Sequence, residues 1–201
     1  DDGMVGEEGT DRTGSSGVRW IVDPLDGTTN YLYGLAGFGV SIAAEVRDEV
    51  VAGVVLDVVR GELFAAVRGG GATRDGRPIR VSDAPDLATA LVATGFSYDS
   101  ARRARQAAVL VELLPRVRDI RRFGAAAVDL CSVACGRVDA YYERGLAPWD
   151  LAAGGLIAVE AGAVVTDFHG GAARAGAVVA AAPLIATELR HLLIAAGADS
   201  A

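Results

Sequence analysis

Short apolar runs separated by polar breaks dominate the first half of the chain, and they predict a sheet of strands. The runs are rich in Val, Ile and Ala, and breaks such as Arg47-Asp48-Glu49 divide them. Asp75-Gly76, followed by Arg77-Pro-Ile-Arg-Val81, is a two-residue hairpin signal. We therefore predict an antiparallel meander, whereas the Gly-, Ser- and acid-rich residues 1–17 are typical of a loop. The predicted strands are residues 20–22, 40–46, 50–59 and 62–68.

Strand-like and helix-like segments alternate in the second half. Small apolar residues at 101, 104, 108, 111 and 114 recur at helical spacing, which predicts a helix whose neighbouring arginines, Arg102, Arg103 and Arg105, form a solvated face. Pro183 is expected to be the first residue of the last helix. Predicted strands are 88–94, 119–123, 138–142, 163–167 and 178–182, and predicted helices are 100–114, 124–135, 150–161 and one from 183. The pattern predicts an α/β (α+β) fold with two lobes, residues 1–86 and 87–201.

One stretch, Trp20-Ile-Val-Asp-Pro-Leu-Asp-Gly-Thr-Thr-Asn30, places Asp23 and Asp26 just after an apolar run. Pro24 has no N–H, so we expect the strand to end there. Asp26 is expected to cap a helical turn whose first amides, from Gly27 onward, are unpaired. The carboxylates suit a hard divalent cation and the amides suit a phosphate oxygen. Because Asp-Pro and Asp-Gly are also ordinary turn formers, this stretch alone is equally consistent with a structural turn.

Composition narrows the classes of function. The chain has 201 residues with 51% hydrophobic and 22% charged, which indicates a globular protein, and a net charge of −7 disfavours nucleic acid as a partner. All 19 basic residues are arginine, so a P-loop or Schiff-base lysine is excluded. Cys131 and Cys135 are expected to be free thiols, and His169 and His191 have no evident partner for a metal site. No signal peptide or long apolar span is evident, so we predict a cytoplasmic protein with no membrane partner.

Two further motifs accompany the central one. Gly6-Glu7-Glu8 precedes it, and Ala147-Pro-Trp-Asp-Leu-Ala-Ala-Gly154 follows far downstream. In this order the three motifs resemble the inositol monophosphatase family, the magnesium-dependent and lithium-sensitive phosphatases. The resemblance implies a layered αβαβα sandwich and a homodimer. The leading helical hairpin of that fold would precede Asp1, so the chain alone is expected to be poorly stable or inactive.

The resemblance also implies a metal site. The metal ligands would be Glu7, Asp23, Asp26 and Asp150, together with the backbone carbonyl of Leu25. They would hold two or three Mg²⁺ ions, with Mn²⁺ possible, since every ligand is an oxygen atom. Glu7, Thr28 and Asp23 are the implied catalytic residues, with Glu7 and Thr28 positioning the attacking water. From the residues alone, Glu7 is consistent with a solvated surface residue and Asp150 with a helix N-cap.

Small residues follow Asp150 at 152–155, and they would let this helix approach another backbone closely, so that Asp150 lies against Asp23 and Asp26. Three carboxylates in one cleft would repel one another unless cations neutralise them.

Substrate contacts are likewise implied by the resemblance. Glu143 matches the position that binds sugar or cyclitol hydroxyls, although a surface glutamate after a strand is an equal alternative. Ala125 stands where family members often carry Ser or Thr. Arg121 and Arg122 could bind phosphate, contact a second subunit or lie on the surface. The implied substrate-binding residues are Asp26, Gly27, Thr28, Gly124, Ala125, Ala126, Glu143 and Asp150.

These residues imply a phosphomonoesterase that hydrolyses inositol monophosphate or a similar polyol or sugar phosphate. The alternatives are a relative acting on fructose bisphosphate, histidinol phosphate or a phosphoadenosine nucleotide, and a non-catalytic interaction protein that retains the fold.

Overall fold

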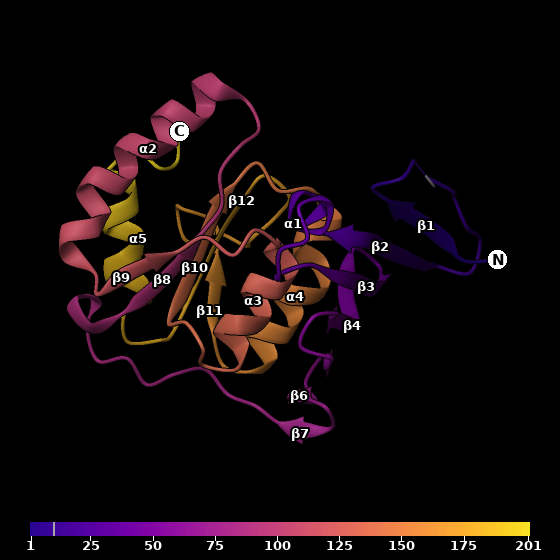
Figure 1. The fold of residues 1–201 in the computed structure, drawn as a ribbon. Coiled ribbons are helices and arrows are strands. Elements are labelled where there is room, and N and C mark those ends of the chain that lie inside the picture. The colour runs from indigo at the N-terminus through magenta and orange to yellow at the C-terminus, as the bar shows by residue number, and fades with distance from the viewer. Residues whose placement is uncertain (10) are drawn as a thin grey trace.

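A computed structural model describes residues 1–9 and 11–201, and two mixed sheets organise it. The first sheet contains seven strands in sequence order, and the second contains five in the order β11-β12-β10-β8-β9 (Figure 1). The first sheet comprises β1 (Gly3–Gly6), β2 (Val18–Asp26), β3 (Gly39–Val46), β4 (Glu49–Asp57), β5 (Glu62–Val67), β6 (Ala72–Arg74) and β7 (Arg77–Pro78). The second comprises β8 (Leu91–Thr94), β9 (Asp119–Arg121), β10 (Ala140–Arg144), β11 (Val164–Thr166) and β12 (Ala177–Ala181).

The first sheet is the predicted meander with one added strand. Strands β2 to β7 pair antiparallel in sequence order, and Asp75-Gly76 forms the two-residue turn between β6 and β7 with positive φ at both residues. The prediction that residues 1–17 form only a loop was wrong, because β1 pairs parallel with β2. Pattern alone missed this strand, since Gly3–Gly6 offers only Met4 and Val5 as apolar residues.

The helices form two layers, one between the sheets and one outside the second sheet (Figure 1). Helices α3 (Ala126–Ala134) and α4 (Pro148–Glu160) contact each other and strands of both sheets. Helices α2 (Ser100–Leu113) and α5 (Ala186–Ala195) cover the other face of the second sheet. This is the predicted α/β sandwich, in four layers. The predicted leading hairpin would precede Asp1 and stays a prediction.

Side chains on the other face of the first sheet are open to solvent. Trp20, Val54, Leu56 and Leu63 are each more than a third exposed, whereas Ile21, Val55 and Phe64 on the helix-facing side are buried. The sequence boundary near residue 86 coincides with the change from one sheet to the other. The assignment of two separate domains stays a prediction.

Glycine residues, which have no side chain beyond hydrogen, let helix α4 approach its neighbours closely, as the sequence predicted. A Cβ on Gly154 would lie 2.9 Å from Cβ of Leu130 in α3, and one on Gly53 in β4 would lie 2.9 Å from Cα of Ala153 in α4. Larger residues at these two positions would push α4 away from α3 and from the first sheet. Helix α4 therefore lies close to the first sheet, and its start meets the end of β2 and the start of β3.

Several predicted boundaries shift. Residues 88–94 divide into the 3₁₀ helix η1 (Leu87–Thr89) and β8, and Pro183 lies in a turn before α5. Pro115 does end α2, because the chain continues as the 3₁₀ helix η2 (Leu114–Arg116). The predicted apolar face of α2 was wrong: its alanines are exposed, and the buried residues are Gln106, Val109 and Leu113. Alanine buries too little surface to fix the orientation of a helix when larger side chains compete.

Candidate active site

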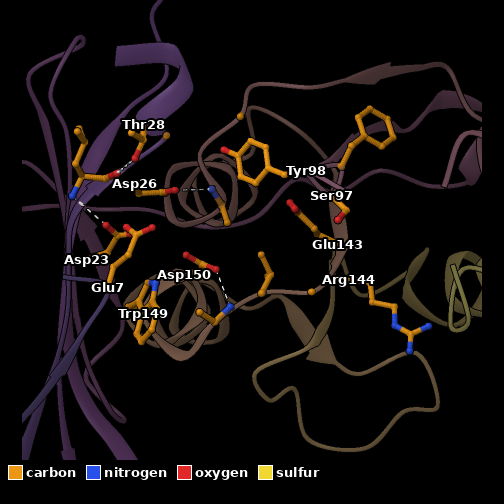
Figure 2. Close-up of a pocket in the computed structure, with 18 of the residues that line it drawn as sticks. Glu7, Asp23, Asp26, Thr28, Ser97, Tyr98, Glu143, Arg144, Trp149 and Asp150 are labelled. Atoms are coloured by element: carbon orange, nitrogen blue, oxygen red, sulfur yellow. Dashed lines mark hydrogen bonds between the residues drawn. The ribbon is translucent and has the colours of Figure 1, made fainter. Parts of the chain in front are cut away.

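A pocket of ≈ 280 Å³ lies where the first sheet, the starts of α3 and α4, and the end of β10 meet. Figure 2 shows the acidic side chains on one side and Glu143 on the other. The pocket residues come from segments far apart in the sequence. Its lining comprises Glu7, Asp23, Leu25, Asp26, Gly27, Thr28, Phe96, Ser97, Tyr98, Arg122, Gly124, Ala126, Glu143, Arg144, Gly145, Leu146, Ala147, Trp149 and Asp150.

Asp23 and Asp26 are positioned by an irregularity in β2. The prediction that the strand ends at Pro24 was wrong, because β2 continues to Asp26 and its register with β3 shifts between Asp23 and Asp26. This bulge accommodates Pro24, which has no N–H for the ladder. The Asp23 carboxylate accepts a hydrogen bond from the Leu25 amide at 2.9 Å, which fixes its direction.

Asp26 does not cap the turn that follows it. The short helix α1 (Thr28–Leu32) has Gly27 at its N-cap, with φ 87° and no side-chain cap. The Asp26 carboxylate instead accepts hydrogen bonds from the amides of Ala126 at 3.1 Å and Ala127 at 2.8 Å, at the start of α3. A residue in the first sheet therefore caps a helix a hundred positions away, and this capping holds α3 against β2.

Asp150 lies at the third position of α4, which begins at Pro148, two residues before the predicted start. Its carboxylate accepts the Ala147 amide at 2.7 Å. The Ser41 hydroxyl in β3 donates to the Trp149 carbonyl at 3.2 Å and ties the start of α4 to the first sheet. These contacts direct Asp150 toward the end of β2.

The three aspartates meet as the sequence predicted. One carboxylate oxygen from each of Asp23, Asp26 and Asp150 lies within 4.8 Å of the others. Asp23 and Asp26 are 1% and 6% exposed. The ion pairs of the described residues involve other carboxylates, as with Asp57, whose oxygen lies 2.7 Å from an Arg60 nitrogen. The cluster thus carries mutual repulsion that no arginine relieves.

Burial and repulsion act together on these carboxyls. Burial, opposed by the Leu25 amide and reinforced by Glu7 and Asp150, raises the pKa of Asp23 to about 7. Burial and the Asp23 charge raise the pKa of Asp26 to about 8. The pKa of Asp150 is also raised, mainly by burial. A hard cation would stabilise the charged carboxylates and so lower these raised pKa values. The all-oxygen donor set fits Mg²⁺.

The other residues of the implied metal site lie in the same pocket. Glu7 follows β1, is exposed, and lies near Asp23 (Figure 2). The Thr28 hydroxyl donates to the Leu25 carbonyl at 3.0 Å. The implied pairing of Thr28 with Glu7 stays a prediction. A larger residue does not fit at position 27, since a Cβ there would lie 2.7 Å from the Gly37 carbonyl oxygen.

Of the implied substrate contacts, Gly124, Ala126 and Glu143 line the pocket. Ala125 is 1% exposed and lies behind Gly27 rather than facing the pocket. The carboxylate of Glu143 accepts a hydrogen bond from the buried Tyr141 hydroxyl, and burial raises its pKa.

Gly95 leaves room for Glu143, because a Cβ there would overlap the Glu143 carboxylate. The alternative of a surface glutamate is therefore excluded for Glu143.

Sequence reasoning missed one wall of the pocket, formed by Phe96, Ser97 and Tyr98 between β8 and α2. These residues belong to none of the three motifs, and only an exposed aromatic residue in a short polar loop marks them. Arg122, whose role was open, also lines the pocket, and its charge opposes the effect of burial on the pKa of Glu143.

A model of the inositol monophosphatase family matches residues 1–198. The chain belongs to the inositol monophosphatase family. Among its relatives, "Inositol-1-monophosphatase" of Mycobacterium leprae is 50% identical over 178 residues, covering 86% of this chain and 61% of the relative. "Nus factor SuhB" of Pasteurella multocida is 48% identical over 177 residues, covering 87% of this chain and 66% of the relative. The chain thus spans less than two thirds of the length of these two family members.

Solved structures of the family share the fold. "Mycobacterium tuberculosis SuhB" superposes with a TM-score of 0.89 at 43% identity, covering 99% of this chain and 78% of that one. "Thermotoga maritima IMPase TM1415" superposes with a TM-score of 0.90 at 33% identity, covering 99% and 76%. In the described part of the chain, no helix has the length and apolarity needed to cross a membrane.

Proposed function

We propose that this chain carries the active site of a magnesium-dependent phosphomonoesterase that acts on inositol monophosphate or a similar polyol or sugar phosphate. The observation that supports it most strongly is the convergence of Asp23, Asp26 and Asp150 in one pocket, where none of the three forms an ion pair with an arginine of the described residues. Family membership supports the same chemistry.

The acidic residues would hold the cation. Asp23, Asp26 and Asp150, with Glu7 and the Leu25 carbonyl at the edge of the pocket, form an all-oxygen ligand set. When bound, the cation supplies positive charge that polarises the phosphate ester and acidifies water. The hydrogen bonds from Leu25, Ala127 and Ala147 hold the three carboxylates in place before the cation arrives.

The remaining pocket residues would orient the substrate and the attacking water. Glu7 and Thr28 would position that water, with Asp23 beside them. Gly27 and Thr28 would lie against the phosphate group. Glu143 and Arg122, at the other side of the pocket, offer an acceptor and a donor for hydroxyl groups of a polyol.

Phosphate release tests the proposal, measured on the 201-residue chain and on the chain extended by the leading helical hairpin that the family resemblance implies, because the 201 residues alone are expected to be poorly stable or inactive. With inositol monophosphate and Mg²⁺, Asp23→Asn and Asp150→Asn should lower kcat/KM by at least about a hundredfold, because each removes an anionic ligand. Asp57→Asn is the matched control. Asp57 is a buried aspartate of the same sheet, and both Asp57 and Asp26 pair with Gly39 of β3. Its carboxylate accepts a hydrogen bond from Arg60 and does not line the pocket. Unchanged turnover in the site variants, or in excess EDTA, would refute the proposal.

A panel of phosphate esters identifies the substrate class. Fructose bisphosphate, histidinol phosphate and a phosphoadenosine nucleotide are the alternatives within the same chemistry. We expect the highest kcat/KM with inositol or a similar polyol monophosphate, because Glu143 faces the pocket. A preference for the nucleotide would replace the proposed substrate without affecting the proposed reaction.

A second candidate is an interaction protein that retains the fold. It is favoured by relatives named "Nus factor SuhB", a name that states no phosphatase activity, of which one is 48% identical. A folded chain that binds Mg²⁺ but releases no phosphate from any ester would support it. We also propose a homodimer, as the family resemblance implies, and sedimentation velocity should show twice the chain mass of 20.6 kDa.

A further inference from the structure

Tyr98 extends over the pocket from the loop between β8 and α2. Its side chain lines the pocket although the residue is 81% exposed. Its hydroxyl lies 3.1 Å from the Thr29 hydroxyl on α1, next to Thr28. Figure 2 shows the ring between the Thr28 side of the pocket and the side that carries Glu143. The ring therefore lies between the residues that would hold the phosphate and Glu143.

The loop that carries Tyr98 is fixed by α2. Arg103 donates to the carbonyls of Ser97 and Tyr98 at 2.9 and 3.1 Å. The Ser97 amide donates to Gln106 at 2.8 Å, and Gln106 is itself buried at 8% exposure. Asp99 caps α2 by accepting the Arg102 amide at 2.7 Å.

The predicted solvated face of α2 is confirmed for Arg103 and Arg105, which are exposed, and Arg103 in addition holds the Tyr98 loop. These contacts also fix the backbone that carries the exposed Tyr98 ring, so that less conformational entropy remains to be lost when a ligand packs on the ring.

The pocket around Tyr98 combines two kinds of surface. Glu143 and Arg122 offer charged hydrogen-bonding groups, whereas the Tyr98 ring offers a flat apolar face. A cyclic polyol or sugar has the matching pair of features: hydroxyl groups at its edge and C–H groups on its faces. An acyclic polyol has no such face.

We propose that Tyr98 contacts the substrate and selects cyclic over acyclic phosphate esters by packing its ring on the C–H face of a cyclitol or sugar. Its bond to Thr29 places that face beside the residues that would hold the phosphate. This inference rests on the proposed function and assigns its substrate class to one side chain.

Steady-state kinetics with two esters tests the inference. Inositol 1-phosphate is the cyclic ester, and glycerol phosphate is the acyclic one. Tyr98→Ala should raise the KM for inositol 1-phosphate about five- to tenfold, which lies within the range for loss of one aromatic contact. It should leave kcat, the KM for glycerol phosphate and inhibition by inorganic phosphate within about twofold. Tyr98→Phe keeps the ring and should stay within about threefold of the original chain.

Tyr33→Ala is the matched control. Tyr33 is the C-cap residue of α1 and is 78% exposed. It does not line the pocket, so its removal should change neither KM. Thermal unfolding of each variant checks that the fold is retained. Equal changes in KM for both esters, or no change in Tyr98→Ala, would overturn the inference while the proposed function stands.

Equilibrium binding provides the second measurement if turnover is absent. Calorimetry with Mg²⁺ should show inositol 1-phosphate binding more tightly than inorganic phosphate, and Tyr98→Ala should remove about that difference. Equal affinity of the original chain for the two ligands overturns the inference alone. Absence of any phosphate binding overturns both the inference and the proposed function.

Discussion

Raising the pH should destabilise the metal-free chain through Asp26. Its pKa is about 8 in the folded chain against an ordinary value of 3.8, so between these values the folded state keeps a proton that the unfolded state releases. Stability depends on pH through this difference in bound protons, and it falls with rising pH wherever the folded state binds more. The contribution of Asp26 is therefore complete below about pH 4 and is lost by about pH 8.

The size of the effect follows from the shift. One group that differs in protonation between the two states changes the free energy of unfolding by about 1.4 kcal/mol per pH unit. From pH 6 to pH 8 the Asp26 carboxyl alone should cost about 2–3 kcal/mol. For a chain of this length we expect the Tm to fall by about 5–10 °C over that interval. Asp23, whose pKa is raised to about 7, acts in the same direction up to that pH.

Mg²⁺ should oppose this loss, because it binds the charged carboxylates. Thermal unfolding followed by circular dichroism, with EDTA or with saturating Mg²⁺, measures both curves on the same protein. The rise in Tm on adding Mg²⁺ should be larger at pH 8 than at pH 6, and Asp26→Asn should reduce this difference, leaving the part due to Asp23. Asp57→Asn should retain the full difference, because the Asp57 carboxylate accepts a hydrogen bond from Arg60 and is not part of the cluster. A metal-free Tm that rises from pH 6 to pH 8, or an Mg²⁺ effect independent of pH, would refute the reasoning.

Three substitutions test the packing around the site. Gly95→Ala should displace Glu143, and kcat/KM for inositol monophosphate should fall at least about tenfold with Mg²⁺ binding retained; full activity would contradict the close approach at Gly95. Gly27→Ala forces a side chain into φ 87° against the Gly37 carbonyl, so urea unfolding should show a loss above about 1 kcal/mol, and an unchanged midpoint would count against this constraint. Asp139→Ala removes the acceptor of the Ser82 hydroxyl and the Leu91 amide, outside the pocket. It should cost about 1–3 kcal/mol of stability with an unchanged rise in Tm on adding Mg²⁺, and a lost Mg²⁺ effect would show that it acts on the site.

Local patterns were sufficient to predict most elements and the acidic residues of the candidate site. Neighbouring residues alone produce the apolar runs of β3, β4 and β5 and the Asp75-Gly76 turn. These features can therefore be predicted without knowledge of the tertiary structure. The small residues at 152–155 also carried long-range information, because together with Gly53 they permit close approach of α4 to α3 and the first sheet.

Features that depend on distant partners were mispredicted or missed. Asp26 was expected to cap the turn that follows it, but its carboxylate is bound by the amides that start α3. The buried face of α2 depends on Gln106, which supports the Tyr98 loop, rather than on its alanines. β1 is a strand only because β2 offers it a parallel edge.

By itself, the sequence determined which groups could bind a cation and where the chain turns, because side-chain chemistry and turn geometry belong to a few adjacent residues. The tertiary structure decided which of those groups meet. Hydrogen bonds such as those from Ala126 and Ala127 to Asp26 join positions a hundred residues apart. The energy of such a contact depends on the whole packed arrangement, including the burial that raises the pKa of Asp26, and no local pattern encodes it.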